Sequence, residues 1–353
     1  MKATTGATTT RSRLTTLCLL AAGVLAAGLP AAAPPANAND PSLGLPDFGA
    51  IAVDQTHRHV FVTGGPSANS IVVTNLSGDV VKRIDGEFGA TGLVLGADGG
   101  TLYAALAGGD AIAAIDTTTL TETARYATPA QTCPTTLART GRYVWFGYGC
   151  AGSWSGGIGR LDTAASPPAV TLNQQGTATF QGAPLVSAAT ADTGPVVAGQ
   201  PHLSLSDTDV YTVAGGALQP GASGTVAGSN LVDQALSPDG SLLLTAAGSQ
   251  NGISGFATTD LSGRGAYGTG HYPNAVEVSP DGQYLAAGAV TNTHRASIYR
   301  LGATTPVRTI DLDGANTADG GLAWSTDSKL LFLVTQPITA TTPTLHVIKD
   351  PTR

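Results

Sequence analysis

The sequence contains little charge and no cluster of basic residues. Only 12% of its 353 residues are charged, and 24 Asp and Glu outnumber 17 Lys and Arg, for a net charge of −7. A chain of this kind is not expected to bind nucleic acid or an anionic membrane surface. After the N-terminal region no apolar run approaches the roughly 20 residues that a membrane-spanning helix needs, so membrane insertion is not expected either.

Motifs of common enzyme classes are also absent. The Gly-rich run over residues 147–159 lacks the Lys-Ser/Thr that ends a phosphate-binding loop. Ser153 and Ser155 miss the spacing of a Gly-x-Ser-x-Gly nucleophile elbow. These absences favour a non-catalytic protein.

The N-terminus has the order of a secretory signal peptide. Basic residues precede an apolar run over residues 17–29, and small residues then lead to Ala38. We predict that residues 1–38 are a signal peptide cleaved after Ala38, and that residues 39–353 form a single secreted domain.

Cysteine is scarce, and its few positions are informative. Cys18 lies inside the apolar run and would be removed, which leaves Cys133 and Cys150. In an exported protein two remaining cysteines are expected to form a disulfide. The loop that it closes is short, and the chain-entropy model gives a stabilisation of about 3 kcal/mol.

What the sequence does contain is a repeated phrase. Ser-Pro-Asp-Gly occurs at residues 237–240 and again at 279–282, 42 residues further on, and weaker copies surround Gly99 and Gly141. A period in the low forties is typical of β-propeller blades. Asp bonds its own backbone and Gly accepts positive φ, so each copy is interpreted as a tight turn and not as a catalytic carboxylate.

Aligned on this turn, the chain divides into seven units. They begin near Asp47, Gly89, Pro134, Gly182, Leu231, Asn274 and Gly320. Each unit contains a short inner strand, a very apolar second strand, a third strand and a more polar outer strand. The predicted fold class is therefore all-β, a seven-bladed β-propeller of four-stranded antiparallel blades.

Two units are irregular. The unit around Gly194 is a poor copy, so six blades with a long insertion is an alternative. The last unit stops before its fourth strand, and the segment preceding Asp47, with Leu43 and Leu45, is expected to supply that strand and close the ring.

The phrase Val60-Phe61-Val62-Thr63-Gly64, the Ser-Pro-Asp-Gly turns and a third strand ending in Asp116 resemble the YVTN family of bacterial propellers, in its exported, actinobacterial type. That family is similar in fold to lactonase-like seven-bladed propellers. The resemblance covers nearly all of the predicted mature chain and implies the fold. It does not choose between binding and catalysis, because propellers serve both.

Polar residues that depart from the repeat occur in the connections between blades. By register these connections surround one mouth of the central channel, and the candidate binding residues there are Glu87, Asn230, His271 and Asp319. Glu87, His271 and Asp319, expected at the surface with no folding role, form the acid–histidine set of a possible enzyme site. The alternative is that these residues only form a hydrated, polar entrance to the channel and bind no specific ligand.

Two loops offer further candidates. Trp154 lies in the Gly-rich run near Cys150, where an exposed aromatic ring could stack on a sugar or a protein partner, or could simply cover the loop. Residues 311–320 gather oxygen ligands that calcium accepts, although an ordinary acidic turn is the better interpretation. No cofactor or metal site is predicted, and a divalent cation is left open.

These observations predict an exported, monomeric β-propeller that acts as a non-catalytic binding or protein-interaction module for an unidentified protein, glycan or small molecule. The alternative is a lactonase- or lyase-type enzyme with the acid–histidine site at the channel mouth.

Overall fold

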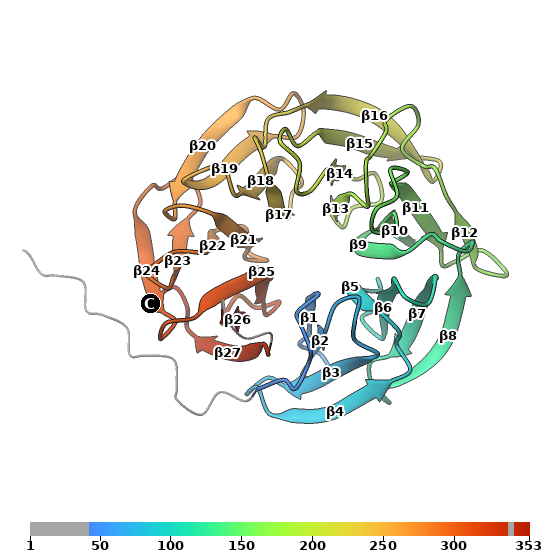
Figure 1. Ribbon diagram of the computed structural model, residues 1–353, viewed down its shortest axis with the longest axis horizontal. Helices are drawn as coiled ribbons and strands as arrows, with labels where there is room; N and C mark the ends of the chain where they lie inside the picture. The colour runs from blue at the N-terminus through green and yellow to red at the C-terminus, as the bar shows by residue number, and fades with distance from the viewer. Residues whose placement is uncertain (1–41, 338–341) are drawn as a thin grey trace, which may run out of the picture. The chain divides into compact units, whose positions relative to one another are not determined.

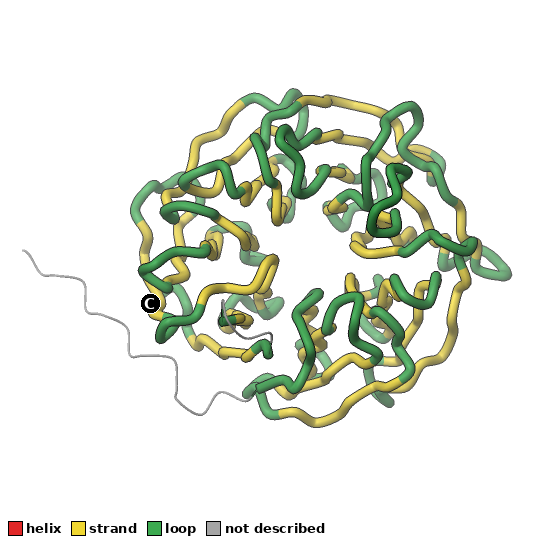
Figure 2. The backbone as a smooth tube through the Cα atoms, in the orientation of Figure 1, coloured by secondary structure: helices red, strands yellow, loops and turns green. Residues whose placement is uncertain are grey.

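The structure is a computed structural model that describes residues 42–337 and 342–353, all within one compact unit, Ala33–Arg353. The predicted signal peptide, residues 1–38, lies outside the described residues. The described part consists of β-strands and loops, with no helix (Figure 2), so the predicted all-β class is confirmed. It accordingly has no helical segment that is long and apolar enough to cross a membrane.

Seven antiparallel sheets are arranged in a ring, with the first strand of each nearest the centre (Figure 1). Blade 1 contains β1 (Ile51–Asp54), β2 (His59–Thr63), β3 (Ser70–Asn75) and β4 (Val80–Asp85). Blade 2 contains β5 (Ala90–Leu95), β6 (Thr101–Leu106), β7 (Ala111–Asp116) and β8 (Thr121–Ala127). Blade 3 contains β9 (Pro134–Thr140), β10 (Tyr143–Tyr148), β11 (Gly157–Asp162) and β12 (Ala169–Thr171).

Blade 4 contains β13 (Leu185–Ala188), β14 (Val196–Gly199), β15 (Thr208–Ala214) and β16 (Ala217–Gly224). Blade 5 contains β17 (Leu231–Leu236), β18 (Leu242–Ala247), β19 (Gly252–Ala257) and β20 (Gly263–Gly268). Blade 6 contains β21 (Pro273–Val278), β22 (Tyr284–Ala289), β23 (Arg295–Arg300) and β24 (Pro306–Asp311). Blade 7 contains β25 (Asn316–Trp324), β26 (Leu330–Gln336) and β27 (Thr344–Lys349). The seven-blade prediction is therefore confirmed, and the six-blade alternative is wrong.

The seventh sheet is completed from the other end of the chain, as expected. Ser42 forms an antiparallel bridge with Thr344 on β27, and the Leu43 N–H donates to the Pro343 carbonyl at 3.1 Å. Leu43 and Leu45 are buried in one apolar cluster with side chains of blades 1 and 7. The N-terminal segment thus covers the free edge of β27 and closes the ring.

The repeated phrase forms the turn that the sequence predicts. The Ser237 hydroxyl donates to Asp239 at 2.5 Å and accepts the Leu242 N–H at 3.0 Å. Ser279 makes the same two bonds with Asp281 and Tyr284. These carboxylates therefore hold their own turns together.

Each junction between neighbouring blades is crossed by a bond from a side chain of one blade to the backbone of another. The pairs are Thr63 with Thr91, Thr91 with Pro134, Thr136 with Pro184, Ser187 with Gln234, Asp233 with Val276, Asn274 with Thr317, and Gln55 with Asp327. The apolar second strands are buried between blades, as expected for strands without apolar–polar alternation. Packing and these bonds together fix the inner strands around the channel.

Candidate functional site

The ring has two faces of different chemistry. Because strands within a blade are antiparallel, the first–second and third–fourth connections share one face, which we call the turn face. The second–third connections and the blade-to-blade connections share the opposite face, which we call the loop face. The turn face is charged, and its connections carry Arg58, Asp79, Asp98, Arg142, Asp192, Asp239, Asp260, Asp281, Asp327 and Lys329.

The loop face has no cation in any of its described connections. Its few carboxylates are mostly engaged. Asp47 accepts bonds from the Phe48 N–H and from Gln336, both at 2.8 Å. Asp110 accepts the N–H groups of Gln131 and Cys133, also at 2.8 Å. Only Asp207 and Asp313, besides these and the buried Glu87, add charge to this face.

Large apolar side chains are exposed on the loop face. Phe88, Trp154, Leu205, Tyr272 and Val290 lie in its connections, at 55%, 78%, 61%, 61% and 36% exposure. The other large apolar side chains that are exposed within the described residues are Val80, Val81 and Val307, on the outer strands β4 and β24. No such side chain lies in a described turn-face connection.

The central channel is a cavity of about 510 Å³ lined by the inner strands of all seven blades, with three carboxylates, Asp233, Glu277 and Asp319. Asp319 projects from an irregular stretch of β25, where the pairing with β26 shifts between Thr317 and Leu322. The Asn274 amide donates to the Asp319 carboxylate at 2.9 Å and fixes its position.

Two of these carboxyls, Asp233 and Glu277, are poised to hold protons near neutral pH. Burial raises the pKa of Glu277 to about 8, and the neighbouring Asp233 adds to the rise. Burial likewise raises the pKa of Asp233 to about 7; hydrogen bonds from the Val276 and Gln234 N–H groups oppose this, and Asp319 adds to it. Within the described residues no group of three or more His, Cys, Asp and Glu side chains is arranged to hold a metal ion.

The predicted site residues occupy separate environments. Asp319 lines the channel, and His271 is exposed beside the Tyr272 ring. Asn230 is also exposed, and its side-chain oxygen lies 3.2 Å from Nδ1 of His202. No hydrogen bond or ion pair in the described part of the chain joins any two of Glu87, Asn230, His271 and Asp319.

Glu87 is not a surface residue, and the expectation that it has no folding role is wrong. It is 0% exposed and its carboxylate lies 3.4 Å from Arg125, which approaches from the outer strand β8. Burial raises the pKa of Glu87 to about 7; Glu122 adds to the rise and Arg125 opposes it. In the connection between blades 1 and 2 the Glu87 side chain points toward the protein interior. Its position in the repeat does not predict this direction.

Sequence reasoning missed Asp233 and Glu277. Both are acidic residues within apolar inner strands, Leu231–Leu236 and Pro273–Val278. An acidic residue inside an apolar inner strand is the signal that could have identified them. Side chains of a strand alternate between its two faces, and in an inner strand one of these faces is turned toward the channel.

Residues 311–320 do not form a single loop around a cation. Asp311 ends β24, Asn316 begins β25, and the Asp311 carboxylate accepts the N–H of Asp313 at 3.1 Å. Asp319 lies farther along β25, in the channel. The oxygen ligands of this segment are thus divided between a turn and the channel.

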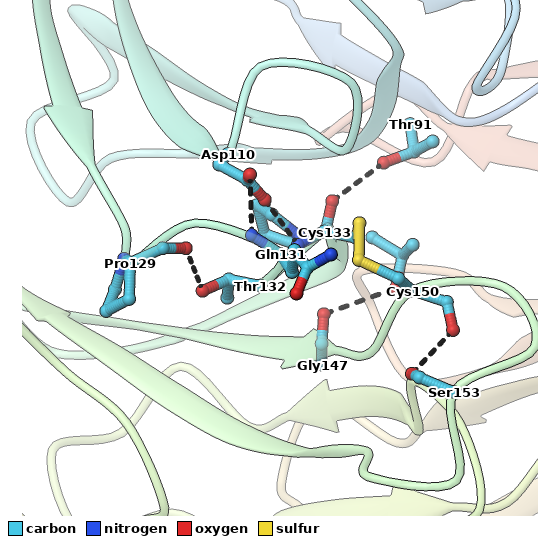
Figure 3. Close-up of a disulfide and its surroundings, with 11 residues drawn as sticks. Thr91, Asp110, Pro129, Gln131, Thr132, Cys133, Gly147, Cys150 and Ser153 are labelled. Atoms are coloured by element: carbon cyan, nitrogen blue, oxygen red, sulfur yellow. Dashed lines mark hydrogen bonds between the residues drawn. A yellow bond between two sulfur atoms is a disulfide. The ribbon is translucent and has the colours of Figure 1, made fainter.

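The predicted disulfide is present (Figure 3). Cys133 and Cys150 are bonded, with their Cα atoms 5.0 Å apart. The bond ties the β10–β11 connection, residues 149–156, to the β8–β9 connection. Trp154 projects from the tied loop and is 78% exposed, so it does not cover the loop.

Comparison with known proteins defines a class and no family. The chain is a seven-bladed β-propeller, but no protein-family model matches it and no curated protein is significantly similar in sequence. The resemblance to the YVTN and lactonase-like propellers therefore receives support for its fold alone.

Solved propellers share the fold at low identity. The chain is similar to the β-propeller domain of Myceliophteria thermophila Cps50 (Swd1), with a TM-score of 0.65, 14% identity, and coverage of 89% of this chain and 100% of that one. Kuenenia stuttgartiensis hydrazine synthase gives a TM-score of 0.64, 16% identity, and 89% and 98% coverage. A chain of a mitotic checkpoint complex gives a TM-score of 0.66, 16% identity, and 94% and 100% coverage.

Proposed function

We propose that this protein is an exported, non-catalytic binding module that uses the loop face of its propeller. One observation carries the proposal: the exposed large apolar side chains of the connections are confined to the face whose described connections have no cation. Because these side chains all lie on the loop face, this is the face that offers exposed apolar surface to a ligand. On the turn face, by contrast, Asp239 and Asp281 are engaged in the hydrogen bonds of their own turns.

The fold comparisons support no single activity. One similar chain belongs to a mitotic checkpoint complex and another to hydrazine synthase, so one architecture serves an assembly and an enzyme. The choice must therefore come from the side chains of this chain.

A second candidate is supported by the channel carboxyls. Asp233 and Glu277 have pKa values raised to about 7 and about 8, near the range in which a general acid or base works at neutral pH. A lactonase- or lyase-type reaction would then use the channel, with Asp319 as the one member of the predicted acid–histidine set that lines it.

One experiment separates the two functions. A loop-face variant has its five exposed large apolar side chains, Phe88, Trp154, Leu205, Tyr272 and Val290, changed to Ser. It is compared with an outer-strand control with Val80, Val81 and Val307 changed to Ser, and with the channel variant Asp233→Asn/Glu277→Gln. Each is screened against protein and glycan arrays and a lactone panel. We expect the loop-face variant to lose binding of a ligand that the outer-strand control and the channel variant still bind. Turnover of a lactone that the channel variant abolishes would establish the enzyme instead.

Export is tested on the same protein. Mass spectrometry of the protein secreted by a bacterial host should give a mature chain that begins at residue 39. Material that stays in the cytoplasm with residues 1–38 attached would contradict this part of the proposal.

A further inference from the structure

We propose that the disulfide-tied loop around Trp154 is a binding platform for an uncharged glycan, with the indole ring stacking on a sugar ring. This inference rests on the proposed binding function and specifies its ligand. It follows from how the loop is held, what surrounds the indole, and which charges are missing.

The loop is fixed from three sides. The disulfide joins Cys150 to Cys133, and the Asp110 carboxylate in turn fixes the Cys133 N–H at 2.8 Å (Figure 3). Within the loop, the N–H and hydroxyl of Ser153 both donate to the Cys150 carbonyl, at 3.0 and 2.7 Å. At its other end the Gly156 N–H donates to the carbonyl of the buried Phe180 at 2.9 Å. The backbone that carries the indole therefore loses little freedom when a ligand binds, which favours affinity.

The surroundings leave the ring open. Residues 151–157 other than Trp154 are all Ala, Gly or Ser, so no bulky neighbour in the loop covers the indole. A side chain added at Gly152 or at Gly182 would meet nothing within 4 Å. A side chain at Gly156 would meet the Gly182 backbone, so the two connections pack closely against each other. A sugar ring needs a flat, accessible aromatic surface of this kind.

The missing charges define the class of glycan. No Lys or Arg lies in the described loop-face connections, so nothing there would attract a sulfated or carboxylated polymer. Sugar hydroxyls instead pair with neutral amides and hydroxyls. Such side chains are exposed on the loop and on the two connections bonded to it, namely Gln131, Ser155, Thr177, Thr179 and Gln181.

A protein partner suits this platform less well. Centres of protein interfaces gather several aromatic side chains and Arg around a desolvated core. Trp154 is the one exposed large apolar side chain of blade 3 in the described residues, and Phe88, Leu205 and Tyr272 lie in connections of other blades. A solitary indole among small neutral residues matches a sugar ring better.

Tryptophan fluorescence gives a direct test. Trp145 and Trp324 are buried, at 0% and 6% exposure, so a shift in emission on adding a ligand reports Trp154. The probes are cellohexaose, xylohexaose, mannohexaose and chitohexaose, with polygalacturonate and heparin as charged counterparts. We expect at least one neutral oligosaccharide to blue-shift the emission and to bind by calorimetry, and neither charged polymer to do so.

The variants locate the site. Trp154→Ala should weaken binding by roughly tenfold or more, the factor that about 1.4 kcal/mol represents. Trp154→Phe should keep part of the affinity, and Cys133→Ser/Cys150→Ser should weaken it by loosening the loop. The matched control Phe88→Ala removes an exposed aromatic ring of another blade and should bind as the wild type does.

Several results would overturn the inference. Binding that Trp154→Ala leaves unchanged would place the glycan elsewhere, and preference for heparin would make the ligand anionic. If no oligosaccharide binds while a protein is bound through Phe88, Leu205 or Tyr272, the glycan assignment fails and the proposed binding function stands. If neither class binds and a lactone is turned over in the channel, both fail.

Discussion

The Asp233 carboxylate in blade 5 accepts the backbone N–H of Val276 in blade 6 at 2.8 Å. This bond is one of the seven blade-to-blade links, yet it is made by a group that also lines the channel beside Glu277 and Asp319. The same carboxylate therefore holds two blades together and is, with Glu277, one of the two channel acids whose pKa is raised. Its protonation should influence how stable the ring is.

Stability should fall as the pH rises from about 4 through about 8. The folded pKa values of Asp233 and Glu277, about 7 and about 8, lie above their ordinary values of 3.8 and 4.5. A group whose pKa is raised by folding stabilises the fold while both states are protonated, and this contribution is lost once the folded group ionises. Melting temperatures measured from pH 4.5 to pH 8.5 should therefore decline.

The variant Asp233→Asn/Glu277→Gln should flatten this decline, because neither amide titrates. Glu87, with its pKa raised to about 7, leaves a residual slope. Equal slopes for the variant and the wild type would mean that the channel acids do not control the pH dependence.

Closure of the ring by the N-terminal segment should contribute several kcal/mol to the free energy of unfolding. Leu43 is 1% exposed and packs against blades 1 and 7, so Leu43→Ala should cost about 2–5 kcal/mol in the free energy of unfolding. Val80→Ala, on an outer strand at 44% exposure, is the control and should change stability by less than about 0.5 kcal/mol. Urea denaturation compares them. Similar midpoints for the two variants would mean that the segment does not hold the ring closed.

The repeat turns should affect folding and leave ligand binding alone. Asp239 accepts bonds from the Ser237 hydroxyl and the Ser241 N–H, so Asp239→Ala should lower stability by about 1 kcal/mol. Asp239→Asn keeps an acceptor and should cost less. Both variants should bind ligand with unchanged affinity at a temperature where they are folded. A selective loss of binding in Asp239→Ala would assign this turn a role in function.

The fold was predictable because its evidence is local and repeated. The turn residues recur at a fixed spacing, and the apolar second strands lie between them, so the seven inner strands begin within a few residues of the expected positions. The disulfide was predictable because only one pairing was available to Cys133 and Cys150. Even the closure could be inferred, since blade 7 has one strand too few and Leu43 and Leu45 are apolar.

The site was harder because it depends on where side chains point. The repeat register predicts that Glu87 lies in a connection between blades. Its burial depends on the direction of its side chain and on Arg125, which lies 38 residues further along the chain on another strand. Asp233 and Glu277 converge only because neighbouring inner strands pack around one channel. Periodicity predicts that such strands are adjacent, but it does not give the depth at which each carboxylate sits.

Tyr272 should be a position where stability and binding conflict. It precedes Pro273 at the start of an inner strand and adopts a left-handed backbone with φ of 53°. Gly89, Asn230 and Cys133 occupy the matching positions of other blades with φ of 65°, 58° and 49°. Glycine and asparagine tolerate this region, and Cys133 is held there by its disulfide and by the bond from its N–H to Asp110. Tyrosine does not, and its side chain is 61% exposed, so burial does not offset the strain.

Tyr272→Asn should therefore raise the free energy of unfolding by about 1 kcal/mol, because the strain disappears and little packing is lost. Asn230→Gly, at a position already suited to this backbone, is the control and should change stability little. Chemical denaturation measures both variants, and the same samples are titrated with whatever ligand the loop face binds. A gain in stability together with weaker binding would show that the strained tyrosine is kept for recognition. A loss of stability in Tyr272→Asn would show instead that the exposed ring makes contacts that support the fold.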